Sequence, residues 1–130
     1  ELDVWQPGEH NGTFRGNNPA FVTATAALDT YWRDSTLRDR TLRRAATVEA
    51  ALGELGPVAV PRGRGLVWGL EFEDGERARA VCRRAFELGL LIETSGPRDE
   101  VVKLLPPLTV SDDELDEGLG ILARAVRHTA

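Results

Sequence analysis

The sequence predicts a two-layer α/β (α+β) fold in which an antiparallel or mixed sheet is covered by helices, in the order α-α-β-β-α-β-β-α. Two observations predict this class. Segments with apolar residues three or four positions apart alternate with short runs rich in β-branched and aromatic residues. No stretch repeats at a fixed period, which excludes a solenoid. The 130 residues are enough for one compact core but too few for two.

The first predicted helix covers about residues 19–33. Asn17 or Asn18 can cap it, and Pro19 suits the first helical position because proline needs no N–H partner there. Many of its residues are small, which favours close packing of another backbone. We therefore expect this helix to have protein surface on more than one side.

The second predicted helix begins at Asp34 or Ser35 and is closed by Gly53, Gly56 and Pro57. Steps of three or four residues predict its buried stripe, which is Leu37, Thr41, Ala45, Val48, Leu52 and Leu55. Four arginines lie off that stripe and predict a solvated basic face rather than an anion site: Arg38, Arg40, Arg43 and Arg44.

The remaining elements alternate between strands and helices. The patterns predict strands at 58–60, 65–72, 90–92 and 101–105, and helices at 76–88 and from Ser111 onward. Ser111 and Glu114 can form a capping box at the start of the last helix. In the helix at 76–88, the apolar face is predicted to consist of Ala78, Val81, Cys82, Ala85 and Phe86.

Composition and charge exclude several classes of protein. A net charge of −5 argues against a nucleic-acid partner, because binding a phosphate backbone needs a concentrated positive field. No apolar run approaches the roughly 20 residues of a membrane-spanning helix, so no membrane association is expected. Cys82 is the single cysteine, which favours a reducing, cytoplasmic setting. His10 and His128 lie at opposite ends of the chain, so no metal site is predicted.

Two segments, one rich in glycine and one acidic, are interpreted as structural and not as functional sites. The glycines between Gly63 and Gly69 open a strand instead of joining a strand to a helix, so they predict a turn and close strand packing rather than a phosphate site. Glu71, Glu73 and Asp74 lie beside a turn and are interpreted as solvated side chains. The abrupt start at Glu1 and the single lysine suggest a piece of a longer protein.

Two segments could carry chemistry. In the loop Gly12–Pro19, the free N–H groups, the Thr13 hydroxyl and the Arg15 guanidinium could converge on a phosphate, although the residues alone favour a plain loop followed by a helix cap. The second segment contains Lys103, which strand alternation places on the same face as Val101 and Leu105. This lysine could extend to solvent at a sheet edge or hold a carboxylate in a cleft.

Four segments carry a resemblance to a known family. The stretch His10–Asn17 resembles the H-x-GTF-x-GN motif of class III (fold-type I) aminotransferases, which depend on pyridoxal phosphate. The strand region Gly63–Glu71 is similar to a strand of that family's small domain. Lys103–Thr109 and Asp112–Leu115 resemble its closing PPL strand and helix. The resemblance covers essentially the whole chain.

The resemblance implies an activity and a set of contacts. It is strongest to members that transfer the amino group of glutamate to aspartate 4-semialdehyde, giving 2-oxoglutarate and 2,4-diaminobutyrate in ectoine biosynthesis. It implies a homodimer in which Thr13 and Gly12 contact the cofactor phosphate of the neighbouring subunit. It also implies that Lys103 binds a substrate carboxylate, where many relatives carry arginine. Arg15 and Asn18 depart from the usual Gly and Pro, and Arg15 is a possible anion contact.

The resemblance also implies that this chain is a C-terminal portion. It assigns residues 1–33 to the end of the cofactor domain, 34–56 to a linking helix and 57–130 to the small domain. Lys103 matches the carboxylate-binding position and not the Schiff-base lysine, so the 130 residues alone are expected to be inactive. Two alternatives stay open: another class III aminotransferase, of ornithine or 4-aminobutyrate type, or a stand-alone α/β binding or dimerisation module.

Overall fold

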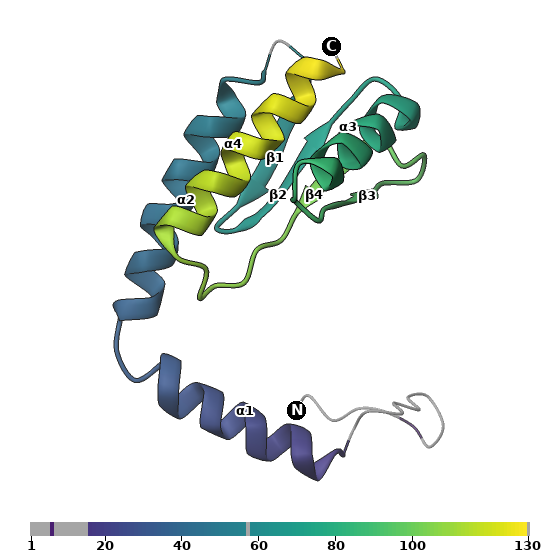
Figure 1. Cartoon of the computed structure of the whole chain (residues 1–130). Helices are drawn as coiled ribbons and strands as arrows, with labels where there is room; N and C mark the ends of the chain where they lie inside the picture. Colours follow the sequence, from purple (N-terminus) through teal and green to yellow (C-terminus); the bar gives the residue numbers. More distant parts are fainter. Residues whose placement is uncertain (1–5, 7–15, 57, 130) are drawn as a thin grey trace. The chain divides into compact units, whose positions relative to one another are not determined.

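The computed structural model describes residues 6, 16–56 and 58–129, and it divides the chain into two compact units, Glu1–Ser35 and Thr36–Ala130. Within the described residues there are four helices and one four-stranded sheet, in the predicted order (Figure 1). The elements are α1 (Asn18–Tyr31), α2 (Thr36–Gly53), β1 (Val60–Arg64), β2 (Val67–Glu71), α3 (Gly75–Glu87), β3 (Glu93–Ser95), β4 (Val101–Leu104) and α4 (Asp112–His128).

Helix α1 is the one element of the first unit among the described residues. It is capped as predicted, because the Asn17 side chain accepts a hydrogen bond from the amide of Ala20 at 3.1 Å. None of its residues is buried, although it carries several large apolar side chains: Phe21, Val22, Leu28 and Tyr31. An apolar helix with no buried face is typical of an element that packs against further protein.

The sheet is antiparallel throughout and has the order β1-β2-β4-β3. The prediction left antiparallel and mixed sheets open, and the structure selects the antiparallel one. Leu70 of β2 pairs with Val102 of β4, and both are fully buried. Strand alternation places Val101 and Lys103 on the opposite face from Val102.

The first hairpin has different strand ends from those predicted. We expected a strand at 58–60, but β1 covers Val60–Arg64, and the Val58 and Ala59 amides bond to the carbonyl of Leu55 as a continuation of the helix end. Gly65 and Leu66 form the turn, and Gly65 adopts a φ of 60°. This tight turn pairs Arg64 with Val67, so the polar Arg62-Gly-Arg64 segment becomes strand.

Gly63 explains the glycine pattern between residues 63 and 69. A Cβ at Gly63 would lie 2.4 Å from the Trp68 ring, so only glycine lets this cross-strand partner pack flat against β1. The Trp68 indole N–H donates to the Gly65 carbonyl at 2.8 Å. The prediction of a turn with close strand packing, rather than a phosphate loop, is confirmed.

The third strand also lies later than predicted. We expected a strand at 90–92, but β3 covers Glu93–Ser95. Its partner β4 ends at Leu104, shortly before Pro106 and Pro107, and pairs no further than Glu93 with Lys103. Residues 90–92 are not paired with β4, and Leu90 and Ile92 pack against the core from an irregular segment.

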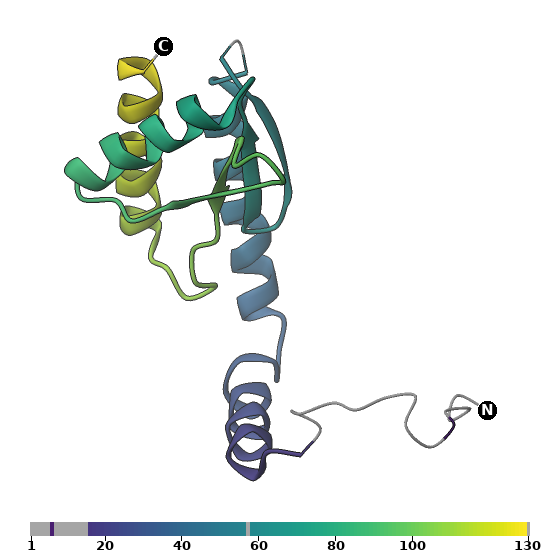
Figure 2. The same cartoon turned by 90° about the vertical axis from the view of Figure 1, so that its right-hand side faces the viewer.

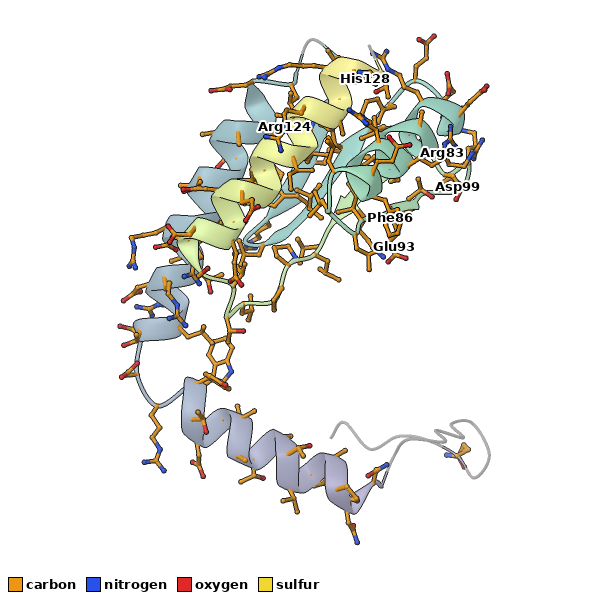
Figure 3. All side chains as sticks on the ribbon, in the orientation of Figure 1. Arg83, Phe86, Glu93, Asp99, Arg124 and His128 are labelled. Carbon is orange, nitrogen blue, oxygen red and sulfur yellow. The ribbon has the colours of Figure 1, made fainter. Side chains whose placement is uncertain are left out.

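One hydrophobic core joins α2, α3 and α4 to the sheet, and Figures 1 and 2 show α3 and α4 lying together over it. In α2 the buried stripe passes through Arg44 instead of Ala45, so the prediction that Arg44 is solvated is wrong. The helix turns so that steps from Thr41 to Arg44 to Val48 face inward. Phe86, labelled in Figure 3, was predicted to be buried but is 68% exposed.

Helix α4 begins as predicted. The Ser111 hydroxyl accepts from the Glu114 amide at 3.2 Å, and the Glu114 carboxylate accepts from the Ser111 amide at 2.9 Å, which completes a capping box. Arg127 and His128 lie in its last turn, where cations are favoured by the helix dipole. Among the described residues no helix is both long and apolar enough to cross a membrane.

Candidate functional site

Lys103 is the predicted site residue that the structure describes. It lies near the end of β4, the strand between β2 and β3, and its side chain is 36% exposed. Gly69 is its partner on β2 and Glu93 is its partner on β3. Because glycine has no side chain, Glu93 is the cross-strand neighbour that can reach the ammonium group.

The Lys103 ammonium donates to a carboxylate oxygen of Glu93, with an Nζ–Oε1 distance of 2.6 Å (Glu93 is labelled in Figure 3). This hydrogen bond and the adjacent positive charge lower the pKa of the Glu93 carboxyl. Lys103 is therefore paired with a carboxylate of the protein itself. Its binding of a substrate carboxylate stays a prediction.

A pocket of about 610 Å³ lies beside this ion pair. It opens between the segment after α3, the end of β4 and the first half of α4, and both Lys103 and Glu93 line it. The rest of its lining is largely apolar: Leu90, Leu91, Ile92, Leu104, Leu105, Pro106, Pro107, Val110, Glu114, Leu115, Gly118, Leu119 and Leu122. The pocket is therefore largely apolar, and its charged lining residues are Lys103, Glu93 and Glu114.

The predicted phosphate loop falls outside the description. His10, Gly12, Thr13 and Arg15 lie outside the described residues, so their roles stay predictions. The adjoining Asn17 is described, and its side chain caps α1.

Cys82 packs against the core from α3 and is partly buried, close to the prediction of a core position. Burial raises the pKa of the Cys82 thiol, and the negative charge of Glu93 raises it further. The thiol is therefore protonated at neutral pH and is a poor nucleophile. Within the described part of the chain, no cluster of three or more His, Cys, Asp or Glu residues could bind a metal ion.

Sequence reasoning missed two residues that shape the site. Glu93 was not singled out, because its pairing with Lys103 depends on the β3–β4 register. Its own strand, β3, was predicted three residues too early, at 90–92. The signal that could have found it is the opposite charge on the two arms of a hairpin. Arg44 was assigned to solvent, although it is buried and bonds to the connection from β4 to α4, part of which lines the pocket.

Acid is expected to destabilise the second unit. The four described carboxyl groups with resolved shifts all have a lowered pKa, caused first by hydrogen bonds from Lys103 to Glu93, from its own amide to Glu100, from Arg44 to Asp112 and from the Ser111 hydroxyl to Glu114. A lowered folded-state pKa gives stability that is full above the unfolded-state pKa, about 4. That stability is lost as the pH falls through the folded-state value. Urea midpoints should therefore be level from pH 7 to about 5.5 and fall below about pH 4.5.

The variant Glu114→Gln tests the cause of this loss of stability at low pH. Glutamine keeps the capping geometry but cannot ionise, so the stability gap between wild type and variant should shrink as the pH falls. Glu117→Gln, at an exposed position on the same helix, is the matched control. A gap that widens in acid would contradict the assignment.

With the geometry described, the chain can be compared with known proteins. Residues 2–126 match the model of the family Aminotransferase class-III. The chain belongs to the class-III aminotransferase family.

Individual relatives match the chain over its whole length. A protein of Streptomyces anulatus named diaminobutyrate–2-oxoglutarate transaminase is 67% identical over 133 residues, which cover 100% of this chain and 32% of that protein. One of the same name from Streptomyces avermitilis is 65% identical over 136 residues, with the same shares covered. The solved lysine aminotransferase from M. tuberculosis superposes with a TM-score of 0.80 at 26% identity, covering 95% of this chain and 29% of that one. The chain thus spans about a third of the length of the curated relatives it matches.

Proposed function

We propose that the chain is the C-terminal portion of a pyridoxal-phosphate-dependent aminotransferase that makes 2,4-diaminobutyrate for ectoine biosynthesis. The enzyme transfers the amino group of glutamate to aspartate 4-semialdehyde and releases 2-oxoglutarate. Relatives that share about two thirds of the residues over the whole chain bear the name of this reaction. The structural observation that carries the proposal is Lys103, which holds a carboxylate at 2.6 Å beside a pocket of about 610 Å³.

The role of Lys103 is to bind and orient a substrate carboxylate. Its ammonium is a single strong point charge, so it fixes the position of a carboxylate with less directional control than the fork of an arginine. Glu93 occupies that charge when no substrate is bound and has to release it when a substrate carboxylate arrives. The two substrates differ in length but each carries a carboxylate, so one cation serves both halves of the reaction.

The cofactor must be held mainly by parts of the enzyme outside the described residues. Pyridoxal phosphate supplies an electron sink for the carbon that loses or gains the amino group. The described residues do not form a cradle for it, since Lys103 is paired with Glu93 on a strand and the pocket walls are largely apolar. Thr13 and Gly12 are proposed to contact the cofactor phosphate of the neighbouring subunit in a homodimer, with Arg15 as a further anion contact.

The proposed division of the chain assigns residues 1–33 to the end of the cofactor domain, 34–56 to a linking helix and 57–130 to the small domain. The chain separates into two compact units after Ser35, close to the first of these boundaries. Val48 and Leu52 of α2 are part of the core of the second unit. The exposed apolar residues of α1 support a larger protein around this chain. A cytoplasmic location is proposed on the free thiol of Cys82.

Two alternative functions are another class III aminotransferase and a stand-alone binding module. An ornithine or 4-aminobutyrate aminotransferase would share the fold, and a solved ornithine delta-aminotransferase from Plasmodium falciparum has a TM-score of 0.77 at 28% identity. That identity is less than half the 67% identity to the relative from Streptomyces anulatus. A stand-alone binding module is disfavoured because the chain spans only about a third of the length of those relatives.

The substrate assignment is tested by assaying the full-length enzyme with 2-oxoglutarate and three amino donors in turn. The kcat/KM for 2,4-diaminobutyrate should exceed the values for ornithine and 4-aminobutyrate by at least about tenfold. Equal values, or a preference for ornithine, would reassign the enzyme within its family.

Thr13→Ala in the full-length enzyme tests the phosphate contact. Loss of one hydrogen bond to a charged phosphate should weaken cofactor binding by about tenfold or more. Thr25→Ala is the control, because the Thr25 hydroxyl bonds to the Phe21 carbonyl within α1. Cofactor affinity is measured by titrating the apoenzyme. Unchanged affinity in Thr13→Ala would remove Thr13 from the site.

A further inference from the structure

Arg44 is a buried cation in the middle of α2. Its side chain is 7% exposed, and its helix neighbours on the same stripe, Val48 and Leu52, belong to the hydrophobic core. A buried guanidinium is costly unless hydrogen bonds compensate for its lost hydration. The groups that accept its hydrogen bonds therefore indicate the structural role of Arg44.

Both hydrogen bonds of Arg44 reach the connection between β4 and α4. The Nε group donates to the Asp112 carboxylate at 2.5 Å, and Nη1 donates to the Leu108 carbonyl at 3.4 Å. We call residues 105–111 the β4–α4 connector, and Asp112 follows it directly as the first residue of α4. Arg44 thus holds the connector at Leu108 and at its C-terminal end.

The connector has few hydrogen bonds of its own. Pro106 and Pro107 have no N–H to donate, and the Val110 amide bonds to the Pro107 carbonyl within the connector. The capping box holds Ser111 to the start of α4. Arg44 adds two hydrogen bonds from α2, one to Leu108 of the connector and one to Asp112 at its end.

The connector also forms one wall of the pocket. Leu105, Pro106, Pro107 and Val110 line the pocket, and the connector continues directly from the strand end that carries Lys103. A displacement of the connector would therefore move both the apolar wall and the strand end beside the carboxylate-binding ammonium. Arg44 is not among the lining residues, so it acts through the connector.

We propose that Arg44 is a positioning residue for the substrate-carboxylate site, because it fixes the β4–α4 connector that forms a wall of the pocket beside Lys103. Its kinetic consequence rests on the proposed function, since it presumes that substrate binds at Lys103. Lysine cannot replace it, because one ammonium cannot reproduce two donors of a planar fork aimed at Asp112 and Leu108.

The test compares Arg44→Lys and Arg44→Met with wild type in the full-length enzyme. Arg38→Met is the matched control, because Arg38 is exposed on the same helix and is not among the charges that act on Asp112. At a temperature well below unfolding, both Arg44 variants should raise the KM for glutamate by about fivefold or more, with kcat within about twofold of wild type. Arg38→Met should leave both constants unchanged. If Arg44→Met does not fold, Arg44→Lys carries the test, because it keeps the charge.

Asp112→Asn tests the same contact from the other side. It should raise the KM for glutamate in the same direction, and combining it with Arg44→Lys should add little, since the two side chains act as one unit. A KM in Arg44→Lys within twofold of wild type would overturn the proposal. A purely structural role would lower the unfolding temperature and leave KM unchanged, which also overturns it.

Amide hydrogen exchange in the full-length enzyme separates this inference from the proposed function. The hydrogen-bonded amides of the connector, those of Val110 and Ser111, should exchange about tenfold faster in Arg44→Lys than in wild type, and as in wild type in Arg38→Met. If the wild-type enzyme transfers no amino group from glutamate, the proposed function fails, and exchange alone decides the role of Arg44. Unchanged exchange of the connector would then overturn the positioning role.

Discussion

Replacing Leu52 with alanine is expected to lower the free energy of unfolding by about 2–5 kcal/mol. Leu52 is fully buried on α2, within the core that joins this helix to the sheet, α3 and α4. Truncation removes buried apolar surface and leaves a cavity that close-packed neighbours fill only in part. Urea unfolding of the 130-residue chain, followed by far-UV circular dichroism, measures the change.

Leu42→Ala is the matched control, because it makes the same chemical change on the same helix at a position that is 60% exposed. It should change stability by no more than about 0.5 kcal/mol. Equal losses in the two variants would mean that α2 presents a different face to the core. The observed stripe through Arg44, Val48 and Leu52 would then be wrong.

Removing the ammonium with Lys103→Met in the full-length enzyme should raise the KM for glutamate by about ten- to a hundredfold. This is the range expected when a charge-assisted hydrogen bond to a carboxylate is lost. Methionine keeps much of the length and apolar character of the side chain, so the strand and the pocket wall should stay intact. Steady-state kinetics with glutamate and with 2,4-diaminobutyrate measure the effect.

Two companion variants identify the cause. Lys103→Arg should retain most of the affinity, because a guanidinium also binds carboxylates. Glu93→Gln removes the negative charge that occupies Lys103 in the structure and should lower the KM or leave it unchanged. A Lys103→Met enzyme with wild-type KM would exclude Lys103 from substrate binding. A Glu93→Gln enzyme with a strongly raised KM would mean that Glu93, instead of yielding to substrate, is needed to hold it.

Local sequence signals predicted most of the fold. Asn17 and Ser111 cap their helices as expected, because a side-chain oxygen before a periodic apolar segment specifies a helix start without reference to distant residues. The glycines between Gly63 and Gly69 were also interpreted correctly from local sequence, since they open a strand and therefore predict a turn with close strand packing. Element types and order follow from such signals.

The wrong predictions concern residues whose positions depend on tertiary contacts. Ala45 and Arg44 are adjacent on α2, and only the docking of α4 selects Arg44 as the inward residue through Asp112. The run 90–92 has strand composition, yet its pairing with β4 stops at Glu93 and Lys103, and residues 90–92 stay irregular. Sequence periodicity does not include the position of the partner strand.

The candidate site was predicted in part. Lys103 was singled out because a lysine in an apolar strand is unusual, and the structure pairs it with Glu93, while its contact with a substrate carboxylate stays a prediction. Its partner Glu93 depends on the register of β3 against β4, which a long-range pairing determines. The assignment of Thr13 came from resemblance to the family and stays a prediction, since that loop lies outside the described residues.

The proposed function makes this chain one portion of an aminotransferase that acts on 2,4-diaminobutyrate and 2-oxoglutarate. It is tested by measuring formation of glutamate from these two substrates with added pyridoxal phosphate, in parallel for the full-length enzyme and for the 130-residue chain at equal concentration. We expect turnover by the full-length enzyme and none by the isolated chain. Glutamate formation by the isolated chain, or its absence with a folded, cofactor-loaded full-length enzyme, would contradict the proposed function.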